Sequence, residues 1–122
     1  MKRVLSILIA IILLLSSCTY IGNTQPIPSW LIGYWDTYNE EGNLIGSCEI
    51  DNSKIEFTIN DPERFTFDLM DLMEENFGWT ESNEDSYTVF LDYNSWIQFI
   101  NHDEFIEVEI DNGLSSYVIQ LR

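Results

Sequence analysis

Apolar and polar residues alternate with a period of two along most of the chain after residue 30, which is the pattern of β-strands with one buried face. The segment Lys54–Ile59 is typical, since Glu56 and Thr58 separate its three apolar residues. Applied along the chain, this pattern predicts eight short strands, which we place at Leu31–Tyr38, Leu44–Ile50, Lys54–Ile59, Arg64–Phe67, Ser86–Asp92, Trp96–Ile100, Phe105–Ile110 and Ser116–Leu121.

A helical pattern interrupts the strands once, over Leu69–Phe77. Asp68 precedes it as a capping residue and Gly78 follows it as a stop signal. The acidic stretch Glu81–Asp85 reads as a loop. The strands on either side are joined by tight turns, of which Asn112-Gly113 is the strongest hairpin signal.

These elements predict an all-β fold with one short helix between the fourth and fifth strands. Consecutive hairpins leave sheet edges that have to be covered or closed. A small up-and-down antiparallel barrel of about eight strands closes them, and its interior is either filled by side chains or holds one small ligand. Two packed sheets made from the same strands are the alternative.

The chain begins like a secretory signal peptide, with Lys2 and Arg3 before the apolar run Val4–Leu15. That run is too short to cross a membrane, which takes about 20 apolar residues. It ends in Leu-Ser-Ser-Cys18, which resembles the lipobox of bacterial lipoproteins. The resemblance implies a signal peptide over 1–17 and palmitate-type acyl chains on Cys18. The alternatives are a secreted protein with a coincidental cysteine and an uncleaved anchor.

We therefore expect a lipidated tether over 18–28 and a folded domain over 29–122. Two or more acyl chains anchor a protein stably. Thr19 follows Cys18 where an aspartate would favour retention at the inner membrane, so we expect the cell envelope, with the outer membrane or cell surface favoured. This lipid anchor is the predicted membrane contact.

Charge narrows the choice of partners. Without residues 1–17 the chain keeps 3 basic and 21 acidic residues, a formal charge of −18. Nucleic acid and anionic lipid head groups need clustered Lys and Arg, so we expect no nucleic-acid partner. All 17 aromatic residues lie in this part, which indicates a folded core and not disorder. Cys48 has no second cysteine to pair with once Cys18 is lipidated, and is expected to be buried; a reactive thiol is the alternative.

The first strand contains Gly33-x-Trp35, which resembles the motif that opens the first strand of lipocalins and related barrels. The segment from Pro28 to Trp35 also looks like the start of small lipocalin-like bacterial lipoproteins, and the resemblance covers 28–122. It implies a lipocalin-like barrel in which the tryptophan closes one end and a basic residue near the last strand packs over it. Arg122 is the positional counterpart of that residue.

Motifs for catalysis are missing from the sequence, which lacks a nucleophile elbow, a phosphate loop and a dinucleotide fingerprint. His102 lies in a predicted turn, where Asp103 or Glu104 could orient it as a base; we expect it to be simply solvated. The acidic group Glu81, Glu84 and Asp85 leaves a weak calcium site open. We expect no enzyme activity, no catalytic residues, no metal and no cofactor.

Aromatic side chains are the remaining candidates for contact with a ligand or partner. Trp30, Tyr34 and Tyr38 are predicted to share one face of the first strand, and Trp96 to lie on the face of its strand opposite Ile97 and Phe99. The alternative is that both faces are partly buried, one by the barrel interior and the other by the helix. Two functions stay open for this membrane-anchored lipoprotein. It binds a small apolar ligand inside a lipocalin-like barrel, or it is a protein-interaction or structural envelope module with a filled core and no ligand.

Overall fold

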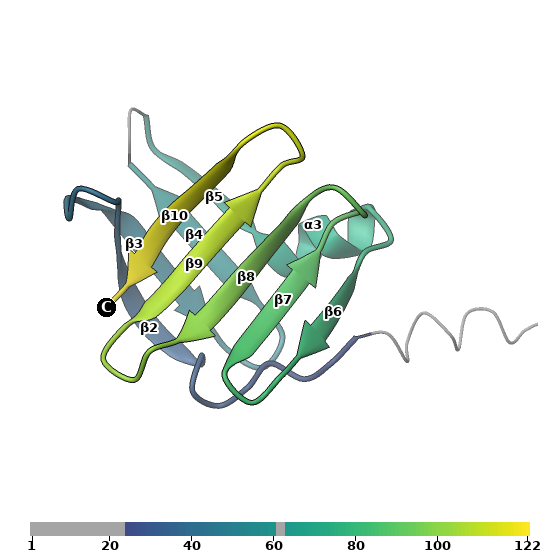
Figure 1. The fold of residues 1–122 in the computed structure, drawn as a ribbon. Helices are drawn as coiled ribbons and strands as arrows, with labels where there is room; N and C mark the ends of the chain where they lie inside the picture. The colour runs from purple at the N-terminus through teal and green to yellow at the C-terminus, as the bar shows by residue number, and fades with distance from the viewer. Residues whose placement is uncertain (1–23, 61–62) are drawn as a thin grey trace, which may run out of the picture.

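The structure is a computed structural model that describes residues 24–60 and 63–122. In this part the chain forms nine strands and one short helix (Figure 1). Their order is β2 (Gly33–Tyr38), β3 (Leu44–Ile50), β4 (Ile55–Ile59), β5 (Phe65–Asp68), α3 (Leu69–Glu75), β6 (Trp79–Ser82), β7 (Ser86–Phe90), β8 (Trp96–Asn101), β9 (Ile106–Asp111) and β10 (Ser116–Leu121).

The strands form one antiparallel sheet in the order β5-β4-β3-β2-β10-β9-β8-β7-β6. Consecutive strands pair with each other except β5 and β6, and the first described strand pairs with the last. Helix α3 falls between β5 and β6, which are the two edges of the sheet, and it contacts β4 and β7. The result is an up-and-down barrel that is open at one seam, where the helix bridges the two edges.

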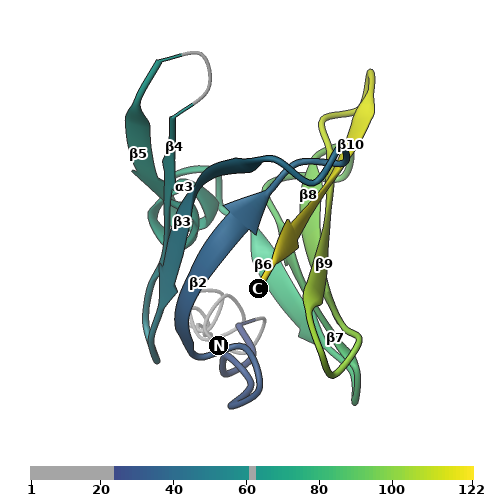
Figure 2. The same ribbon diagram turned by 90° about the vertical axis from the view of Figure 1, so that its left-hand side faces the viewer.

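The sheet curls so that β3, β4 and β5 face β7, β8 and β9 across the interior (Figure 2). The two halves join through a short ladder between β2 and β10. Leu121 pairs there with Thr37, and Asp36 and Arg122 exchange backbone hydrogen bonds of 3.0 and 2.9 Å. Because this ladder is short, packing across the interior has to hold the halves together.

The core is made of inward-facing side chains from both halves. Phe57 on β4 stacks on Phe99 on β8 with ring centroids 6.4 Å apart, and Tyr87 on β7 is also fully buried. Cys48 belongs to this core, as predicted, and burial raises the pKa of its thiol, which disfavours the reactive thiolate.

Helix α3 begins and ends with recognisable caps. The Asp68 carboxylate accepts a hydrogen bond of 2.9 Å from the Met70 amide, as its predicted capping role requires. At the other end Phe77 takes a left-handed conformation with φ of 55°, and the Gly78 amide donates to the Met73 carbonyl over 2.8 Å. This pattern is the Schellman motif, with phenylalanine in the position that glycine usually takes.

The structure confirms the predicted all-β, barrel-like fold and the helix between the fourth and fifth strands. It adds one strand, β6, which takes in the first two residues of the acidic stretch Glu81–Asp85 that we had placed in a loop. The first strand begins at Gly33, two residues later than predicted. Trp30 therefore lies in the preceding turn, partly buried against the core.

The segment before β2 runs along one end of the barrel towards β6 (Figure 1). The Gln25 amide donates to the Thr80 hydroxyl over 2.5 Å, and the Tyr87 hydroxyl donates to the Gln25 carbonyl over 3.0 Å. Ile27 is buried in the core. The described end of the predicted tether, residues 24–28, is thus attached to the barrel by backbone hydrogen bonds and one apolar side chain.

Candidate binding surface

The outer face of β6, β7 and β8 carries a row of aromatic side chains at one end. Cross-strand pairing aligns Trp79 with Phe90 and Phe90 with Trp96. The Trp79 and Phe90 rings stack with centroids 4.8 Å apart and planes 8° apart, and Tyr93 in the next turn lies 5.2 Å from Trp79. We call Trp79, Phe90, Tyr93 and Trp96 the outer aromatic cluster.

A hollow of about 200 Å³ lies beside this cluster. Its centre is Thr88, a short side chain whose neighbours in register on the outer face, Glu81 and Gln98, are longer. Phe90 and Trp96 line the hollow on the aromatic side. A short residue among long ones leaves a depression in a pleated surface, so the hollow follows from the sequence of three paired strands.

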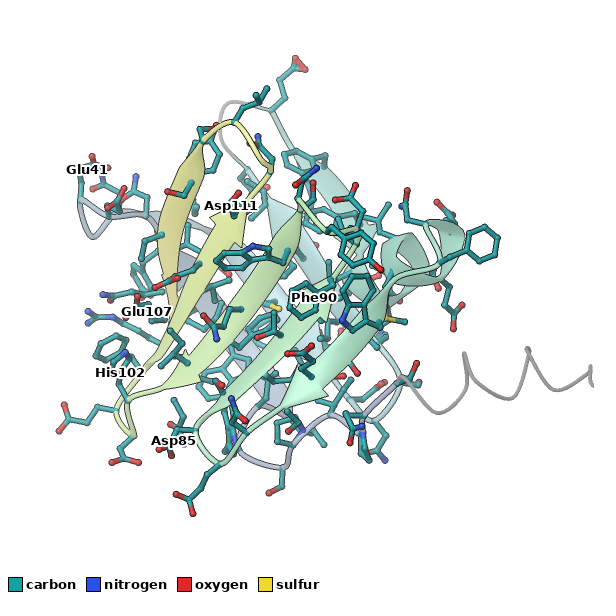
Figure 3. All side chains as sticks on the ribbon, turned by 45° about the vertical axis from the view of Figure 1, so that its right-hand side comes forward. Glu41, Asp85, Phe90, His102, Glu107 and Asp111 are labelled. Carbon is teal, nitrogen blue, oxygen red and sulfur yellow. The ribbon has the colours of Figure 1, made fainter. Side chains whose placement is uncertain are left out.

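Acidic side chains lie on one side of this region, beyond β8. Glu107, Glu109 and Asp111 alternate along the outer face of β9, next to β8 (Figure 3). Burial and the neighbouring Glu107 carboxylate raise the pKa of Glu109, as expected where carboxylates crowd without a cation between them. Strands β6 to β10 contain no Lys or Arg. The face combines aromatic rings with negative charge.

Arg122 follows β10 directly, and its side chain lies at the margin of this face. Its guanidinium sits 5.6 Å from the Tyr38 ring centroid and 5.7 Å from that of Phe105. It also donates two hydrogen bonds, of 3.0 and 2.6 Å, to the Gln120 amide oxygen. The Leu121 side chain faces the core. Because side chains alternate along the chain, Arg122 faces outward, and Trp35 lies on the opposite, inner side of the sheet. The structure therefore places Arg122 over outer aromatic rings, where the resemblance had placed it over Trp35.

Gly33 and Trp35 are close neighbours on the inner face. The Trp35 indole nitrogen donates to the Leu31 carbonyl over 2.9 Å, and a side-chain carbon at Gly33 would lie 3.7 Å from that nitrogen. Gly33 has φ of +152°, a conformation that favours glycine. Trp35 packs against the core, so both residues are structural at this site.

The predicted aromatic contact residues do not form one surface. Tyr34 is 70 % exposed on the outer face of β2, and Tyr38 lies under Arg122. Trp30 packs against the core from its turn. Trp96 is the predicted residue that joins the outer aromatic cluster.

His102 lies in a turn, as predicted, and its ring stacks on Phe105 with centroids 4.8 Å apart. Its partner is Glu107 on β9, whose carboxylate lies 2.9 Å from the His102 Nε2, and not Asp103 or Glu104 as the sequence suggested. Within residues 24–60 and 63–122, no group of three or more His, Cys, Asp or Glu side chains is arranged to hold a metal ion.

A second hollow, of about 350 Å³, lies between the segment before β2 and helix α3. Its apolar lining comes from Ile27, Met70 and Met73, and polar residues such as Glu74 line it as well. Cys18 and the predicted signal peptide lie outside the described residues. Among the described residues no helix is long and apolar enough to cross a membrane.

Comparison of the chain with protein-family models, characterised proteins and solved structures finds no match. The resemblance to lipocalins and to small bacterial lipoproteins therefore stays a prediction.

Sequence reasoning missed most of the outer aromatic cluster. Trp79 belongs to the strand that was read partly as a loop, and Phe90 follows two polar residues, Ser86 and Thr88, on the outer face of β7. The alternation of side chains along β7 could have identified Phe90. Tyr87 and Val89 face inward, so the next residue, Phe90, faces outward.

Proposed function

We propose that this protein is a lipid-anchored module of the bacterial envelope that binds a protein partner through the outer face of β6 to β9. The observation that carries the proposal is the outer aromatic cluster beside a hollow. Tyr93 in this cluster is exposed, and Trp79, Phe90 and Trp96 are half-buried on the outer face. Aromatic rings that gather in one surface patch are typical of protein contact sites, where Trp and Tyr supply much of the binding energy. Single exposed apolar residues need no such explanation.

Packing of the interior favours an interaction module over a ligand carrier. Phe57, Tyr87 and Phe99 are 2 % exposed or less, and they fill the space between the two halves. The two hollows described above both open to the outside, and neither is lined by these residues. Binding at an outer face is compatible with a filled core.

The anchor is a separate part of the proposal and has its own test. Cys18→Ser removes the acceptor for the acyl chains and leaves the folded domain unchanged. We expect the variant to lose labelling by radioactive palmitate and to leave the membrane fraction. Unchanged membrane association of Cys18→Ser would contradict the anchor.

Partner binding is best tested in intact cells by site-specific photo-crosslinking. A photoreactive amino acid at Gln98, inside the hollow, should give a defined protein adduct. The same group at Tyr34, an exposed outer position on the other half of the sheet, is the matched control. We expect the Gln98 adduct to disappear when Phe90→Ala is added and to persist with Glu41→Gln. Equal adducts from Gln98 and Tyr34 would contradict the proposal.

One observation favours the alternative function, the binding of a small apolar ligand. Inward-facing residues become exposed towards the end where β4 finishes and β10 begins, and there Phe65 and Tyr117 are 51 % and 53 % exposed. Native mass spectrometry of the protein from its own host tests this function directly. A retained apolar molecule, lost in Tyr117→Asp, would support it over the interaction module.

A further inference from the structure

We infer that the hollow beside Phe90 and Trp96 receives an arginine side chain from a basic segment of the partner. The inference rests on the proposed function, because it names what the partner presents to the outer face of β6 to β9.

The walls of the hollow suit a flat cation. Phe90 and Trp96 line one side of it, and Trp79 stacks behind Phe90 and holds that ring in place. Cations are attracted to the faces of aromatic rings, and tryptophan is the strongest partner. A guanidinium is planar and weakly hydrated, so it stacks on such rings at a lower desolvation cost than the compact ammonium of lysine.

Polar groups on the opposite side of the hollow can bind the edge of the guanidinium. Glu81 offers a carboxylate, Asn83 and Gln98 offer amide oxygens, and Thr88, which is 8 % exposed, lies at the floor. Arginine carries five N–H donors and no acceptor, so it needs several oxygens around it. The lining supplies aromatic faces on one side and acceptors on the other.

The size of the hollow suits one side chain better than a drug-sized ligand. Sites for drug-sized molecules measure about 300–1,000 Å³, and this hollow measures about 200 Å³. This volume is large enough for the end of one long side chain. An arginine reaches such a depression from an extended segment lying across the strands.

Charge complementarity identifies the rest of the partner segment as basic. Glu107, Glu109 and Asp111 lie on β9, one strand beyond the β8 wall of the hollow. Arg122 stacks on Tyr38 and Phe105 at the far margin of the face, which shows that this face already accommodates one guanidinium on aromatic rings. A segment with further Lys or Arg residues around the central arginine matches these carboxylates.

The test uses the full-length chain in neutral detergent. The probes are a short glycine peptide carrying arginine and the same peptide with lysine in place of arginine. Binding is followed by tryptophan fluorescence and by calorimetry. Two variants change the hollow, Glu81→Gln and Trp96→Ala; Glu41→Gln, in the exposed hairpin on the other half, removes the same charge elsewhere and is the control (Figure 3).

We expect saturable binding of the arginine peptide, weakened about threefold to tenfold by each hollow variant and unchanged by Glu41→Gln. Glu81→Gln keeps the shape of the side chain, so it remains informative if Trp96→Ala disturbs the fold. Equal weakening by Glu41→Gln would overturn the inference, because it would show general charge attraction. Equal binding of the lysine peptide, or competition by a neutral oligosaccharide, would overturn the assignment to arginine.

The peptide test and the crosslinking test distinguish failure of the arginine assignment from failure of the proposed interaction surface. If Gln98 still gives its adduct in cells but no variant of the hollow affects the peptide, the arginine assignment is wrong and the interaction surface stands. If the Gln98 adduct is also absent, both are wrong.

Discussion

The Phe57 ring stacks on the Phe99 ring across the interior of the barrel, with centroids 6.4 Å apart and planes 19° apart. The two residues belong to β4 and β8, which lie in opposite halves of the sheet. The ladder between β2 and β10 that joins the halves is short, and at the other edges helix α3 contacts β4 and β7. This aromatic contact is therefore a principal tie between them, because it is buried and central.

Removing one ring of this pair should destabilise the whole domain. We expect Phe99→Ala to lower the free energy of unfolding by about 3–5 kcal/mol, the usual cost of emptying a core aromatic site. Tyr34→Ala, at an exposed position, should change it by less than about 0.5 kcal/mol. Urea denaturation of both variants measures the difference. A loss below about 1 kcal/mol for Phe99→Ala would show that the halves do not depend on this contact.

Two glycines should respond to alanine for different reasons. A side-chain carbon at Gly78 would overlap the backbone carbonyl of Phe90, so Gly78→Ala has to push β7 away and should cost about 3 kcal/mol. Gly42 has open space around it but φ of +86°, so Gly42→Ala should cost about 1 kcal/mol of backbone strain. Thermal or urea denaturation of Gly78→Ala and Gly42→Ala measures which variant loses more stability. The reverse order would contradict the close approach of Gly78 to β7.

Thr37 should be replaceable by valine with a gain in stability. Its hydroxyl is buried and has no hydrogen-bond partner among the described residues. Valine keeps the shape and removes the desolvated oxygen, so we expect a gain of about 1 kcal/mol. Thr58→Val, which removes an outer hydroxyl bonded to Thr66 over 3.1 Å, is the control and should be near neutral. A loss of stability in Thr37→Val would reveal a hidden partner for its hydroxyl.

The sequence predicts most strands of this fold because their buried faces are apolar at every second residue. The predicted bounds of Leu44–Ile50 and Ser116–Leu121 match the structure, and Asp68 caps the helix as expected. The alternating pattern does not predict strand β6, because this strand lacks an apolar inward face. Its inward residue is Thr80, which is 2 % exposed, and its large apolar residue, Trp79, faces outward.

The binding surface was harder to predict than the fold. Trp79, Phe90 and Trp96 come from three strands, and their alignment depends on the register between those strands. Periodicity identifies the face of a residue within one strand but not the residue that lies beside it on the next. Trp96 alone could be proposed from its own strand.

The carboxylates of β9 should make the stability of the protein depend on pH. Burial and the adjacent Glu107 raise the pKa of Glu109 above its ordinary value of 4.5. The folded protein therefore binds this proton more tightly than the unfolded chain does. The stabilisation is complete below pH 4.5 and is lost as the pH rises through the raised pKa.

Glu109→Gln should prevent this loss of stability at higher pH. The glutamine amide cannot ionise, and its N–H group can still donate a hydrogen bond to the Glu107 carboxylate. We expect the variant to unfold at a higher urea concentration than the natural protein at pH 7, with the difference shrinking below pH 4.5. Glu41→Gln corrects for the general benefit of removing one negative charge from a chain with a net charge of −16. If both variants gain equally at pH 7, the crowding of Glu107 and Glu109 has no energetic consequence. A larger gain for Glu109→Gln would show that these carboxylates repel each other in the folded state.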